Sequence, residues 1–378
     1  MRLALFANDY WPTIGGVQTA VRGLAQAPRA RGHLPLVLTS QPGGSPSVEE
    51  VDGLPVRRFS WGLKPRTSFP LRAWRVRRQV RDAVLRWKPD ALYVHFVTVS
   101  ALYARDCARL AKAPLLLSFR GNDVMGIAPR SIATRRIYSG LTAAADANLF
   151  CSPWLEQVGR ATPWFRGRPS SIGVLPDAVT VVPRRVPEGV ERGSYALAAG
   201  RMVRKKGFDL LIRAWATLGS RIAAPLWLAG DGEERRNLEQ LAGELELGPR
   251  VKFLGPIPHP EVLGLMEHAA LTIVPSRDEP YGIVVVEAQA LGVPVVAARV
   301  GNLPYLIDHG RTGYLAEPTV ERLARAIADA WDDPRRCDVG RAGREAPGAR
   351  RSYESMAAEL EQWIARARAD GTGRRAWT

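Results

Sequence analysis

Two glutamates near the C-terminal third have the spacing and the surroundings of a ligand site. Glu279 follows a predicted strand at 271–276, and Glu287 lies nearly two turns into a predicted helix at 282–291, among valine and alanine residues. A buried carboxylate is costly unless it accepts hydrogen bonds. The paired hydroxyls of a ribose are natural partners for Glu287, and a structural salt bridge is the alternative.

The start of the same predicted helix offers backbone donors. Tyr281, Gly282 and Ile283 lie where a helix begins, and the unpaired N–H groups of a helix N-terminus bind anions. We therefore expect a phosphate group near these three residues, beside Glu279.

A basic pair follows another predicted strand, at 195–200. Arg201 lies at the carboxyl end of that strand, and Lys206 comes just before a predicted helix. Ligands of open parallel sheets collect at such strand ends. A guanidinium and an ammonium there suit a diphosphate that gains charge as its bond to a sugar breaks. A solvated basic turn is the alternative in a chain so rich in arginine.

Two further clusters lie in the first half of the chain. Gly15 and Gly16 separate the first predicted strand from the first predicted helix, where glycine lets a ligand approach the backbone or merely permits a tight turn. The pattern G-x-G-x-x-G is absent, which counts against a dehydrogenase. His95 lies at the end of one later predicted strand, and Arg120 and Asp123 follow another. These residues place polar groups on the acceptor side, although a lone histidine at a strand end is more often a core residue.

The alternation of short apolar runs with helical patterns predicts an α/β protein. Predicted strands lie at 2–8, 34–40, 91–96, 114–119 and 147–152, and again at 195–200, 225–230, 250–255, 271–276 and 294–298. Because strand, helix and strand in sequence give parallel pairing with right-handed crossovers, we expect two Rossmann-like, doubly wound domains that face a central cleft.

The boundaries of these domains follow from composition. We expect an N-terminal, acceptor-side domain at 1–183, and a linker at 184–194 in a segment rich in proline, glycine and arginine. A nucleotide-sugar-binding domain is expected at 195–349. Residues 350–378 begin with a helical pattern that we expect to pack back toward the N-terminal domain.

The composition is that of an ordinary globular protein with 46% hydrophobic and 24% charged residues. Three scattered cysteines, Cys107, Cys151 and Cys337, form neither a disulfide framework nor a metal cluster. The apolar run before Asn8 is shorter than the roughly 7–15 residues of a signal peptide. No run approaches the ~20 apolar residues of a membrane span. A cytoplasmic location is therefore expected.

The formal net charge of +16 invites a polyanion-binding interpretation. Only six of the 53 basic residues are lysines, and the arginines are spread over the whole chain, which a biased genome composition explains as well. We therefore expect no nucleic-acid partner. The segment 72–87 alternates arginines with leucine, valine and tryptophan, the pattern of a basic amphipathic helix that lies on an anionic membrane. A solvated helix with its apolar stripe in the core is the alternative.

With these motifs in hand, the chain resembles family 4 of the glycosyltransferase classification, the retaining GT-B enzymes. The resemblance spans nearly the whole length and rests on the order and spacing of its blocks: YWPTIGGV, GRMVRKKG, LAGDGEERRNLEQLA, RVKFLG, EPYGIVVVEAQALGVPVVA and GRTGYLAEP. It implies that a hexose passes from a UDP- or GDP-sugar to a glycan or lipid-linked acceptor with retained configuration. It also implies front-face attack, with no metal and no other cofactor.

The resemblance implies a role for each motif. Arg201 and Lys206 would hold the diphosphate, Glu287 would bind the ribose, and Glu279 would contact the sugar. Gly16 would lie near the phosphates from the opposite domain. The segment that includes Val251, Phe253 and Leu254 would pass the nucleotide base.

Several positions depart from the pattern of the family. Arg120 stands where many members have a histidine, and arginine stays protonated and cannot act as a base. His95 matches a histidine common in the family. Asp177 stands where asparagine is typical, and Gly301-Asn302 opens a segment that usually reads Gly-Gly-x-Pro-Glu.

Two other functions compete with sugar transfer. One keeps the fold but makes the protein a nucleotide-sugar epimerase or a phosphorylase, and the other makes it a non-enzymatic binder of polyanions. An epimerase converts its donor without releasing nucleotide, and polyanion binding weakens steeply with salt.

Overall fold

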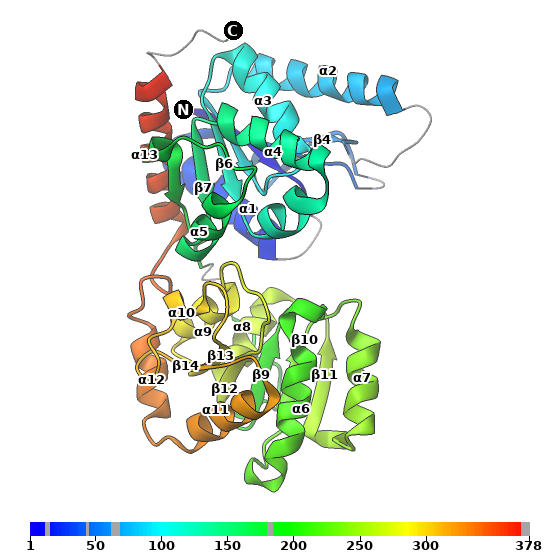
Figure 1. The fold of residues 1–378 in the computed structure, drawn as a ribbon, viewed down its shortest axis with the longest axis vertical. Helices are drawn as coiled ribbons and strands as arrows, with labels where there is room; N and C mark the ends of the chain where they lie inside the picture. Colours follow the sequence, from blue (N-terminus) through cyan, green and yellow to red (C-terminus); the bar gives the residue numbers. More distant parts are fainter. Residues whose placement is uncertain (12–15, 43–44, 62–68, 180–183, 372–378) are drawn as a thin grey trace. The chain divides into compact units, whose positions relative to one another are not determined.

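The computed structural model describes residues 1–11, 16–42, 45–61, 69–179 and 184–371. The chain forms two compact units (Figure 1). The first comprises Met1–Thr180 together with Ser352–Thr378, and the second comprises Val181–Arg351. Each unit is an α/β domain built on its own sheet.

The first unit contains an eight-stranded sheet in the order β3-β4-β2-β1-β5-β6-β7-β8. Among the described strand pairs of this sheet, only β3–β4 is antiparallel. The strands are β1 (Arg2–Ala7), β2 (Leu34–Ser40), β3 (Val48–Val51), β4 (Leu54–Phe59), β5 (Ala91–His95), β6 (Leu115–Phe119), β7 (Ala147–Phe150) and β8 (Ile172–Val174). All five strands predicted in this half are confirmed.

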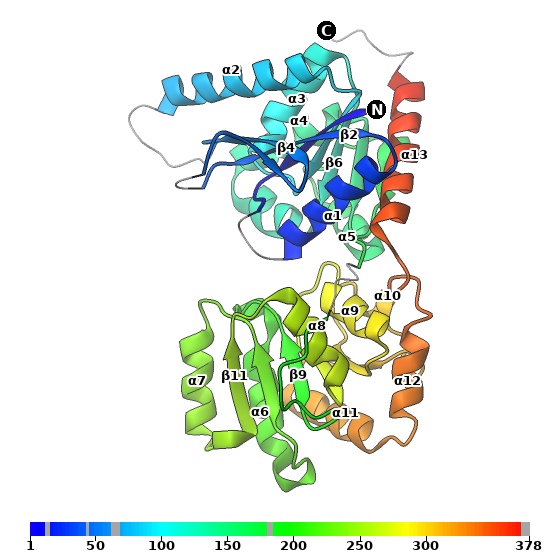
Figure 2. The ribbon, with the colours of Figure 1, turned by 180° about the vertical axis from the view of Figure 1, so that it is seen from behind.

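Helices cover both faces of this sheet. They are α1 (Gly16–Ala30), α2 (Phe69–Trp87), α3 (Ser100–Ala111), α4 (Ile132–Ala144), α5 (Pro153–Ala161) and α13 (Tyr353–Gly371). Helix α3 packs on β1, β5 and β6 with α2 and α4 beside it, whereas α1 packs against α13 (Figure 2). The last helix of the chain thus completes the core of the first unit, where Met356, Leu360 and Ile364 are buried.

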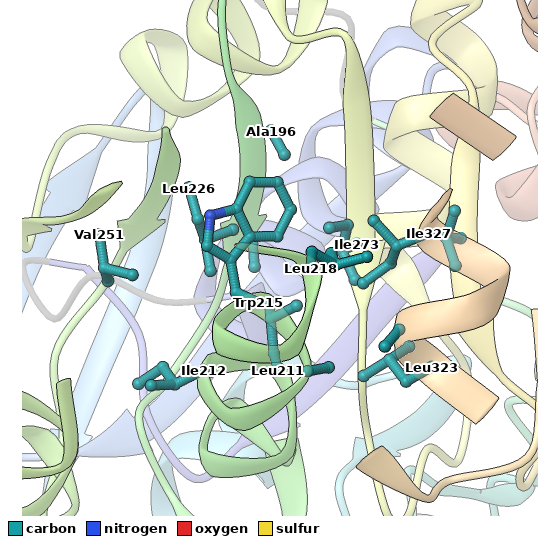
Figure 3. Close-up of a cluster of buried hydrophobic side chains, with 14 of the residues drawn as sticks. Ala196, Leu211, Ile212, Trp215, Leu218, Leu226, Val251, Ile273, Leu323 and Ile327 are labelled. Carbon is teal, nitrogen blue, oxygen red and sulfur yellow. The ribbon is translucent and has the colours of Figure 1, made fainter. Parts of the chain in front are cut away.

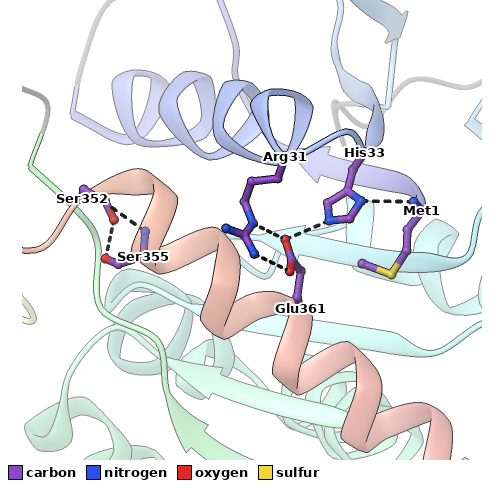
Figure 4. A network of polar contacts seen from close by, with 6 residues as sticks. All are labelled: Met1, Arg31, His33, Ser352, Ser355 and Glu361. Atoms are coloured by element: carbon purple, nitrogen blue, oxygen red, sulfur yellow. Dashed lines mark hydrogen bonds and ion pairs between the residues drawn. The ribbon is translucent and has the colours of Figure 1, made fainter.

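A polar cluster fastens α13 to the first unit (Figure 4). The guanidinium of Arg31 donates from Nε and Nη2 to the two oxygens of Glu361, at 2.5 and 2.9 Å. His33 Nε2 lies 2.8 Å from Glu361 Oε1, and the amino group of Met1 lies 3.1 Å from His33 Nδ1. Two basic groups therefore share one carboxylate, which holds the C-terminal helix against the start of the chain.

The second unit contains a parallel six-stranded sheet in the order β11-β10-β9-β12-β13-β14. Its strands are β9 (Ala196–Ala199), β10 (Leu226–Ala229), β11 (Val251–Gly255), β12 (Leu271–Val274), β13 (Val295–Ala298) and β14 (Tyr314–Ala316). The five strands predicted in this half are confirmed, and β14 is added. The direction in which strands are added reverses between β9 and β12, which makes the carboxyl ends of these two strands the switch point where ligands bind in such folds.

The helices of the second unit pack on both faces of this sheet. They are α6 (Phe208–Leu218), α7 (Arg235–Glu244), α8 (His259–His268), α9 (Ile283–Leu291), α10 (Leu303–Leu306), α11 (Val320–Asp332) and α12 (Arg336–Gly343). Trp215 of α6 is fully buried at the centre of one hydrophobic cluster, between the strands and α11 (Figure 3). Leu211 and Leu323 are buried in the same cluster.

The segment 184–194, which we expected to be a linker, is counted with the second unit. The backbone N–H of Arg185 donates to the carbonyl of Pro260 at 3.1 Å, and that of Gly193 donates to the carbonyl of His268 at 2.7 Å. This segment therefore runs along α8 and is bound to both of its ends.

Candidate active site

The loops after β9 and β12 touch at the switch point of the second sheet. Gly207 has a φ of +67°, and a Cβ atom added there would lie 2.1 Å from the carbonyl oxygen of Pro275. The backbone N–H of Arg277 donates to the carbonyl of Lys205 at 2.8 Å. Only glycine allows this approach, so the sequence at 207 brings together two loops that are far apart along the chain.

Arg277 adds a side-chain link between the same two loops. Its guanidinium donates to both carboxylate oxygens of Asp209, in the first turn of α6, at 2.6 and 2.7 Å. It also donates to the carbonyl of Arg204 at 3.1 Å. The sequence predictions did not assign Arg277 a role. Its contacts show that it links the loop after β12 to the loop after β9.

Lys206 and Glu279, both predicted as site residues, meet at this point. The Nζ atom of Lys206 lies 2.6 Å from Oε2 of Glu279, and the hydroxyl of Ser276 donates to the same oxygen at 3.2 Å. Glu279 is buried, and the side chain of Lys206 is about one-quarter exposed. The carboxylate therefore acts as the counter-ion of an ammonium group that other anions can also reach.

Lys206 belongs to a cluster of cations. Lys205 is half-buried, and burial together with the nearby charges of Lys206 and Arg201 lowers its pKa. Arg201 lies two residues after the end of β9 and is exposed. Because these cations repel one another, a bound anion with several oxygens would relieve the repulsion.

Asn302 holds the backbone of the glutamate loop. Its backbone N–H donates to the carbonyl of Glu279 at 2.9 Å, and its side-chain amide donates to the carbonyl of Tyr281 at 2.8 Å. Gly301 has a φ of +55°, and a Cβ atom there would lie 2.3 Å from the Glu279 carbonyl oxygen. Gly301, which matches the pattern of the family, and Asn302, which departs from it, thus hold the glutamate loop in place.

The start of α9 lies at the same edge of the sheet. Tyr281 is buried, Gly282 has a φ of +97°, and Ile283 is the first residue of the helix. The positive φ turns the chain sharply into α9, so the first N–H groups of the helix lie directly after the glutamate loop.

Glu287 is bound by a histidine that the sequence predictions did not name. Nε2 of His259, the first residue of α8, lies 2.7 Å from Oε1 of Glu287. Burial lowers the pKa of His259, but the hydrogen bond and the charge of Glu287 outweigh it and raise that pKa above its ordinary value. Glu287 lies inside α9 and is 8% exposed, so its predicted burial is confirmed.

The predicted base-binding segment is strand β11, at one edge of the sheet. Val251 is buried, whereas Phe253 and Leu254 are half-buried. The strand ends at Gly255, whose carbonyl accepts the N–H of Gly230 at 2.9 Å. The carboxyl end of β11 is thereby joined to the loop after β10, and the role of these residues stays a prediction.

The predicted residues of the first unit form a buried network rather than an open cluster. Arg120, which follows β6, donates from Nη1 to Oδ1 of Asp177 and from Nη2 to the hydroxyl of Tyr93, both at 2.8 Å. Its side chain is 4% exposed. His95 is buried beside Tyr93, and burial and the charge of Arg120 keep its pKa well below the ordinary value. The imidazole of His95 is therefore neutral.

Asp123 fastens the loop after β6 to the loop after β5. Its carboxylate accepts hydrogen bonds from four backbone N–H groups, those of Val97, Arg120, Gly121 and Val124, at 2.8–3.1 Å. Burial raises the pKa of Asp123 to about 6, against the effect of these donors. Because its oxygens are engaged by the backbone, the geometry favours a positioning role for Asp123 over contact with a substrate.

Polar residues at the switch point of the first sheet were missed. Asn8 and Asp9 follow β1, and their side chains are joined by a hydrogen bond of 3.0 Å. Ser40 donates to Asp9 at 3.3 Å, and Thr98 donates to Asn8 at 3.4 Å. The signal was available, because Asn8 ends the first predicted strand and Asp9 directly follows it.

The predicted glycine pair is only partly visible. Gly15 lies outside the described residues, and Gly16 begins α1. Within the described ranges, no group of three or more His, Cys, Asp and Glu side chains could hold a metal ion. Among the same residues, no helix is both long and apolar enough to cross a membrane.

Comparison with known protein families matches both halves of the chain. Residues 15–162 match the glycosyl transferase 4-like domain, and residues 184–346 match the glycosyl transferases group 1. Each match covers about two-fifths of the chain, and together they identify it as a glycosyltransferase. The resemblance drawn from the sequence motifs is thereby confirmed, and the protein is a transferase enzyme.

Two curated relatives of this glycosyltransferase illustrate the range of the family. A D-inositol 3-phosphate glycosyltransferase of Pseudarthrobacter chlorophenolicus is 40% identical over 162 residues, which is 41% of this chain and 39% of that relative. A glycogen synthase of Mycobacterium tuberculosis is 26% identical over 88% of this chain and 87% of its own length. The aligned part therefore spans about two-fifths of the first relative and most of the second.

Solved structures of similar fold cover almost the whole glycosyltransferase chain. Sucrose-phosphate synthase from Thermosynechococcus elongatus superposes with a TM-score of 0.79 at 23% identity, covering 98% of this chain and 99% of that one. Anabaena HepE in complex with UDP-glucose gives a TM-score of 0.77 at 22% identity, covering 96% and 99%. With the two parallel-sheet domains, these likenesses establish the GT-B fold.

Proposed function

We propose that this glycosyltransferase moves a hexose from a UDP- or GDP-sugar onto a hydroxyl of a phosphorylated-sugar, glycan or lipid-linked acceptor, with retained configuration and without a metal. The observation that carries the proposal is the Lys206–Glu279 pair at 2.6 Å, at the switch point of the second sheet and beside the start of α9. Helix start and cations together suit a diphosphate.

The names of similar proteins support the choice of substrates. HepE has been solved in complex with UDP and with UDP-glucose, and other relatives are named as an inositol 3-phosphate glycosyltransferase and a glycogen synthase. A uridine nucleotide and a glucose-type sugar are therefore the first donor to test. The two relatives favour a phosphorylated polyol or a glucan as acceptor.

The proposed donor site balances charge with protein groups alone. The diphosphate takes the place of the Glu279 carboxylate beside Lys206, and Arg201 and Lys205 add positive charge nearby. As the bond from the anomeric carbon to oxygen breaks, its electrons pass to the diphosphate, whose growing charge these cations stabilise. Glu279, once displaced from Lys206, is free to bind sugar hydroxyls.

The acceptor hydroxyl completes the proposed reaction. Its oxygen attacks the anomeric carbon on the face from which the diphosphate leaves, and its proton passes to a departing phosphate oxygen. No nucleophile of the protein is needed in this scheme. The side chains of His95 and Arg120 are both buried, and Arg120 is engaged by Asp177 and Tyr93, so this scheme assigns neither of them a contact with the acceptor.

A turnover assay with a panel of sugar nucleotides tests this proposal. Nucleoside diphosphate release and sugar transfer are measured for the wild type, Glu287→Ala, Lys206→Ala and the matched control Glu244→Ala, an exposed residue of α7. We expect the two site variants to lose turnover and the control to keep it. Full turnover in Glu287→Ala, or conversion of donor without nucleotide release as in an epimerase, would contradict the proposal.

We also propose that the first unit contacts an anionic membrane through the α2–α3 arginine surface. This surface lines a hollow of about 350 Å³ between the two helices, and the residues that define it are Trp74, Arg77, Arg78, Arg81, Arg109 and Leu110. Trp74 is 58% exposed and Leu110 is 47% exposed. Large apolar side chains framed by arginines are typical of surfaces that lie on anionic lipid.

The charges of this surface support the same partner. Two carboxylates lie among the arginines: Asp106 pairs with Arg77 at 2.7 Å, and Asp82 lies 3.5 Å from Arg81. The positive charge remains in excess. Arg78 lies over the ring of Trp74 at 5.8 Å, which keeps this apolar group beside a cation. This surface therefore offers both contributions to peripheral membrane binding: insertion of apolar side chains and attraction to anionic headgroups.

Vesicle flotation with phosphatidylcholine, with or without phosphatidylglycerol, tests this contact. Because each basic residue contributes about 1 kcal/mol near an anionic surface, the triple variant Arg77→Glu, Arg78→Glu, Arg81→Glu is expected to bind at least about 100-fold more weakly. The matched control reverses three exposed arginines of the second unit, Arg213, Arg236 and Arg322. Equal weakening by both triple variants would show that only net charge matters, and the surface would have no special role.

A further inference from the structure

The carboxylate of Glu287 is held by one side chain from a neighbouring helix. Nε2 of His259 lies 2.7 Å from Oε1 of Glu287. His259 begins α8, Glu287 lies in the middle of α9, and the two helices pack together. The side chain of Glu287 is 10% exposed and that of His259 is 28% exposed. This contact therefore reaches solvent at its edge, where a ligand can also reach it.

The surroundings of Glu287 make such a contact necessary. Its neighbours Val285, Val286 and Ala288 are fully buried, and Gln289 is buried as well. A charged oxygen among these groups would be strongly destabilising without a donor. In the part of the chain that the structure describes, His259 is the side chain that forms a hydrogen bond with this carboxylate.

The position of the bond decides what the carboxylate can do next. His259 occupies Oε1, so Oε2 is the oxygen left to accept from a ligand hydroxyl. A carboxylate with one oxygen fixed can rotate little, and its remaining lone pairs keep one direction. Binding then costs less conformational entropy than it would for a free side chain.

We infer that His259 is a positioning residue that fixes the Glu287 carboxylate to receive the ribose hydroxyls of the donor nucleotide. The inference rests on the proposed function, in which Glu287 binds the ribose. His259 does not touch the reacting atoms in this scheme. It acts on the affinity for the nucleoside and not on the rate of sugar transfer.

The inference separates the ligands that depend on His259 from those that do not. A nucleoside diphosphate without the sugar keeps the ribose. The His259 variant should therefore lose affinity for it by the same factor as for the full donor. A 2′,3′-dideoxy nucleoside diphosphate lacks the hydroxyls that Glu287 would receive. Its binding should therefore be the same for the wild type and the variant.

The experiment compares His259→Ala and His259→Gln with the control His268→Ala at the other end of α8. We expect His259→Ala to raise the donor KM about tenfold to a hundredfold, the loss of a hydrogen bond to a charged group, with kcat within about twofold. Glutamine offers an N–H donor at similar reach, so His259→Gln should recover most of the affinity. His268 bonds to the carbonyl of Gly264 within its own helix, and its replacement should leave KM unchanged.

Three results would overturn the inference. The first is an unchanged KM in His259→Ala, and the second is a fall in kcat as large as the rise in KM, with no recovery in His259→Gln. The third is a loss of affinity for the dideoxy nucleotide as large as that for the normal nucleotide. If His259→Ala does not fold, His259→Gln and the dideoxy comparison still decide the question. Glu287→Ala separates this inference from the proposed function. Retained donor binding in Glu287→Ala refutes the proposed function. If Glu287→Ala loses donor binding while His259→Ala keeps the KM of the wild type, only the positioning role is refuted.

Discussion

Removal of one partner of the Arg120–Asp177 ion pair is expected to destabilise the first unit strongly. Nη1 of Arg120 lies 2.8 Å from Oδ1 of Asp177, and the two side chains are 4% and 16% exposed. Breaking a buried pair on one side leaves an uncompensated charge, at a cost of about 3–5 kcal/mol. Because Asp177 keeps some contact with solvent, we expect about 3 kcal/mol for Arg120→Met.

The double variant separates the pair from its surroundings. Asp177→Asn leaves the guanidinium of Arg120 buried and is expected to cost a similar amount, although Arg120 keeps its bond to Tyr93. Arg120→Met with Asp177→Asn removes both charges, and it should be only about 1–2 kcal/mol less stable than the wild type. Neutral replacement of a buried pair is often tolerated. The expected coupling energy is therefore several kcal/mol.

Urea unfolding of the four proteins measures this coupling. The two units are separate domains, so the transition of the first unit is followed by hydrogen exchange in β6, next to Arg120. Additive losses in the double variant, with a coupling below about 0.5 kcal/mol, would refute the reasoning. Such a result would mean that Arg120 and Asp177 are stabilised independently of each other.

Three further outcomes are expected. The guanidinium of Arg31 lowers the pKa of Glu361 to about 2 from an ordinary 4.5, so this contact stabilises the fold above pH 4.5 and is lost as the pH falls toward 2. Glu361→Gln should therefore cost about 1 kcal/mol at pH 7, an amount reduced by solvent exposure of the pair, and the gap to the wild type should narrow in acid unfolding titrations; a gap that does not change with pH would contradict this. Trp215→Ala should cost about 3–5 kcal/mol in unfolding of the second unit, whereas Trp215→Phe should cost less than about 1.5 kcal/mol, because the buried indole N–H has no partner among the described residues; equal costs would contradict it. Gly207→Ala should weaken donor binding at least about tenfold in calorimetry, because the Cβ would lie 2.1 Å from the Pro275 carbonyl oxygen at a positive φ; unchanged affinity would show that the contact between the loops does not shape the site.

The sheets were largely predictable, because their central strands are short, apolar and buried on both faces. The strands that were not predicted, β3, β4, β8 and β14, lie at or next to the edges of the two sheets. Strands β3 and β4 were missed although Asp52 and Gly53 between them have φ values of +54° and +73°, as in a two-residue hairpin turn. Asp-Gly between strand-like runs is a known signal for this turn. Strand β3 was not predicted because half of its residues are polar, and an exposed edge strand needs no apolar run.

The donor site was predictable where motifs are local and unpredictable where partners are distant. Lys206 and Glu279 each follow a strand, but only the strand order, with β9 beside β12, brings them to 2.6 Å. His259 escaped notice because nothing near it in sequence marks it as the partner of Glu287. That pairing depends on how α8 packs on α9.

Two departures from the pattern of the family proved to be partners. Arg120 replaces a histidine and Asp177 replaces an asparagine, and the structure joins the two new residues in one buried ion pair. A single sequence presents them as separate changes 57 positions apart. Their charges are opposite, which was the available hint, but a chain with 53 basic residues offers many such pairs.

A crystal structure of the enzyme with a bound sugar nucleotide would test the central claim most directly. We expect the diphosphate oxygens within about 3 Å of Lys206 Nζ, the ribose hydroxyls on Glu287, and Glu279 released from Lys206 toward the sugar. A ligand bound elsewhere, with the Lys206–Glu279 pair intact and Glu287 without contact to the ribose, would contradict the account.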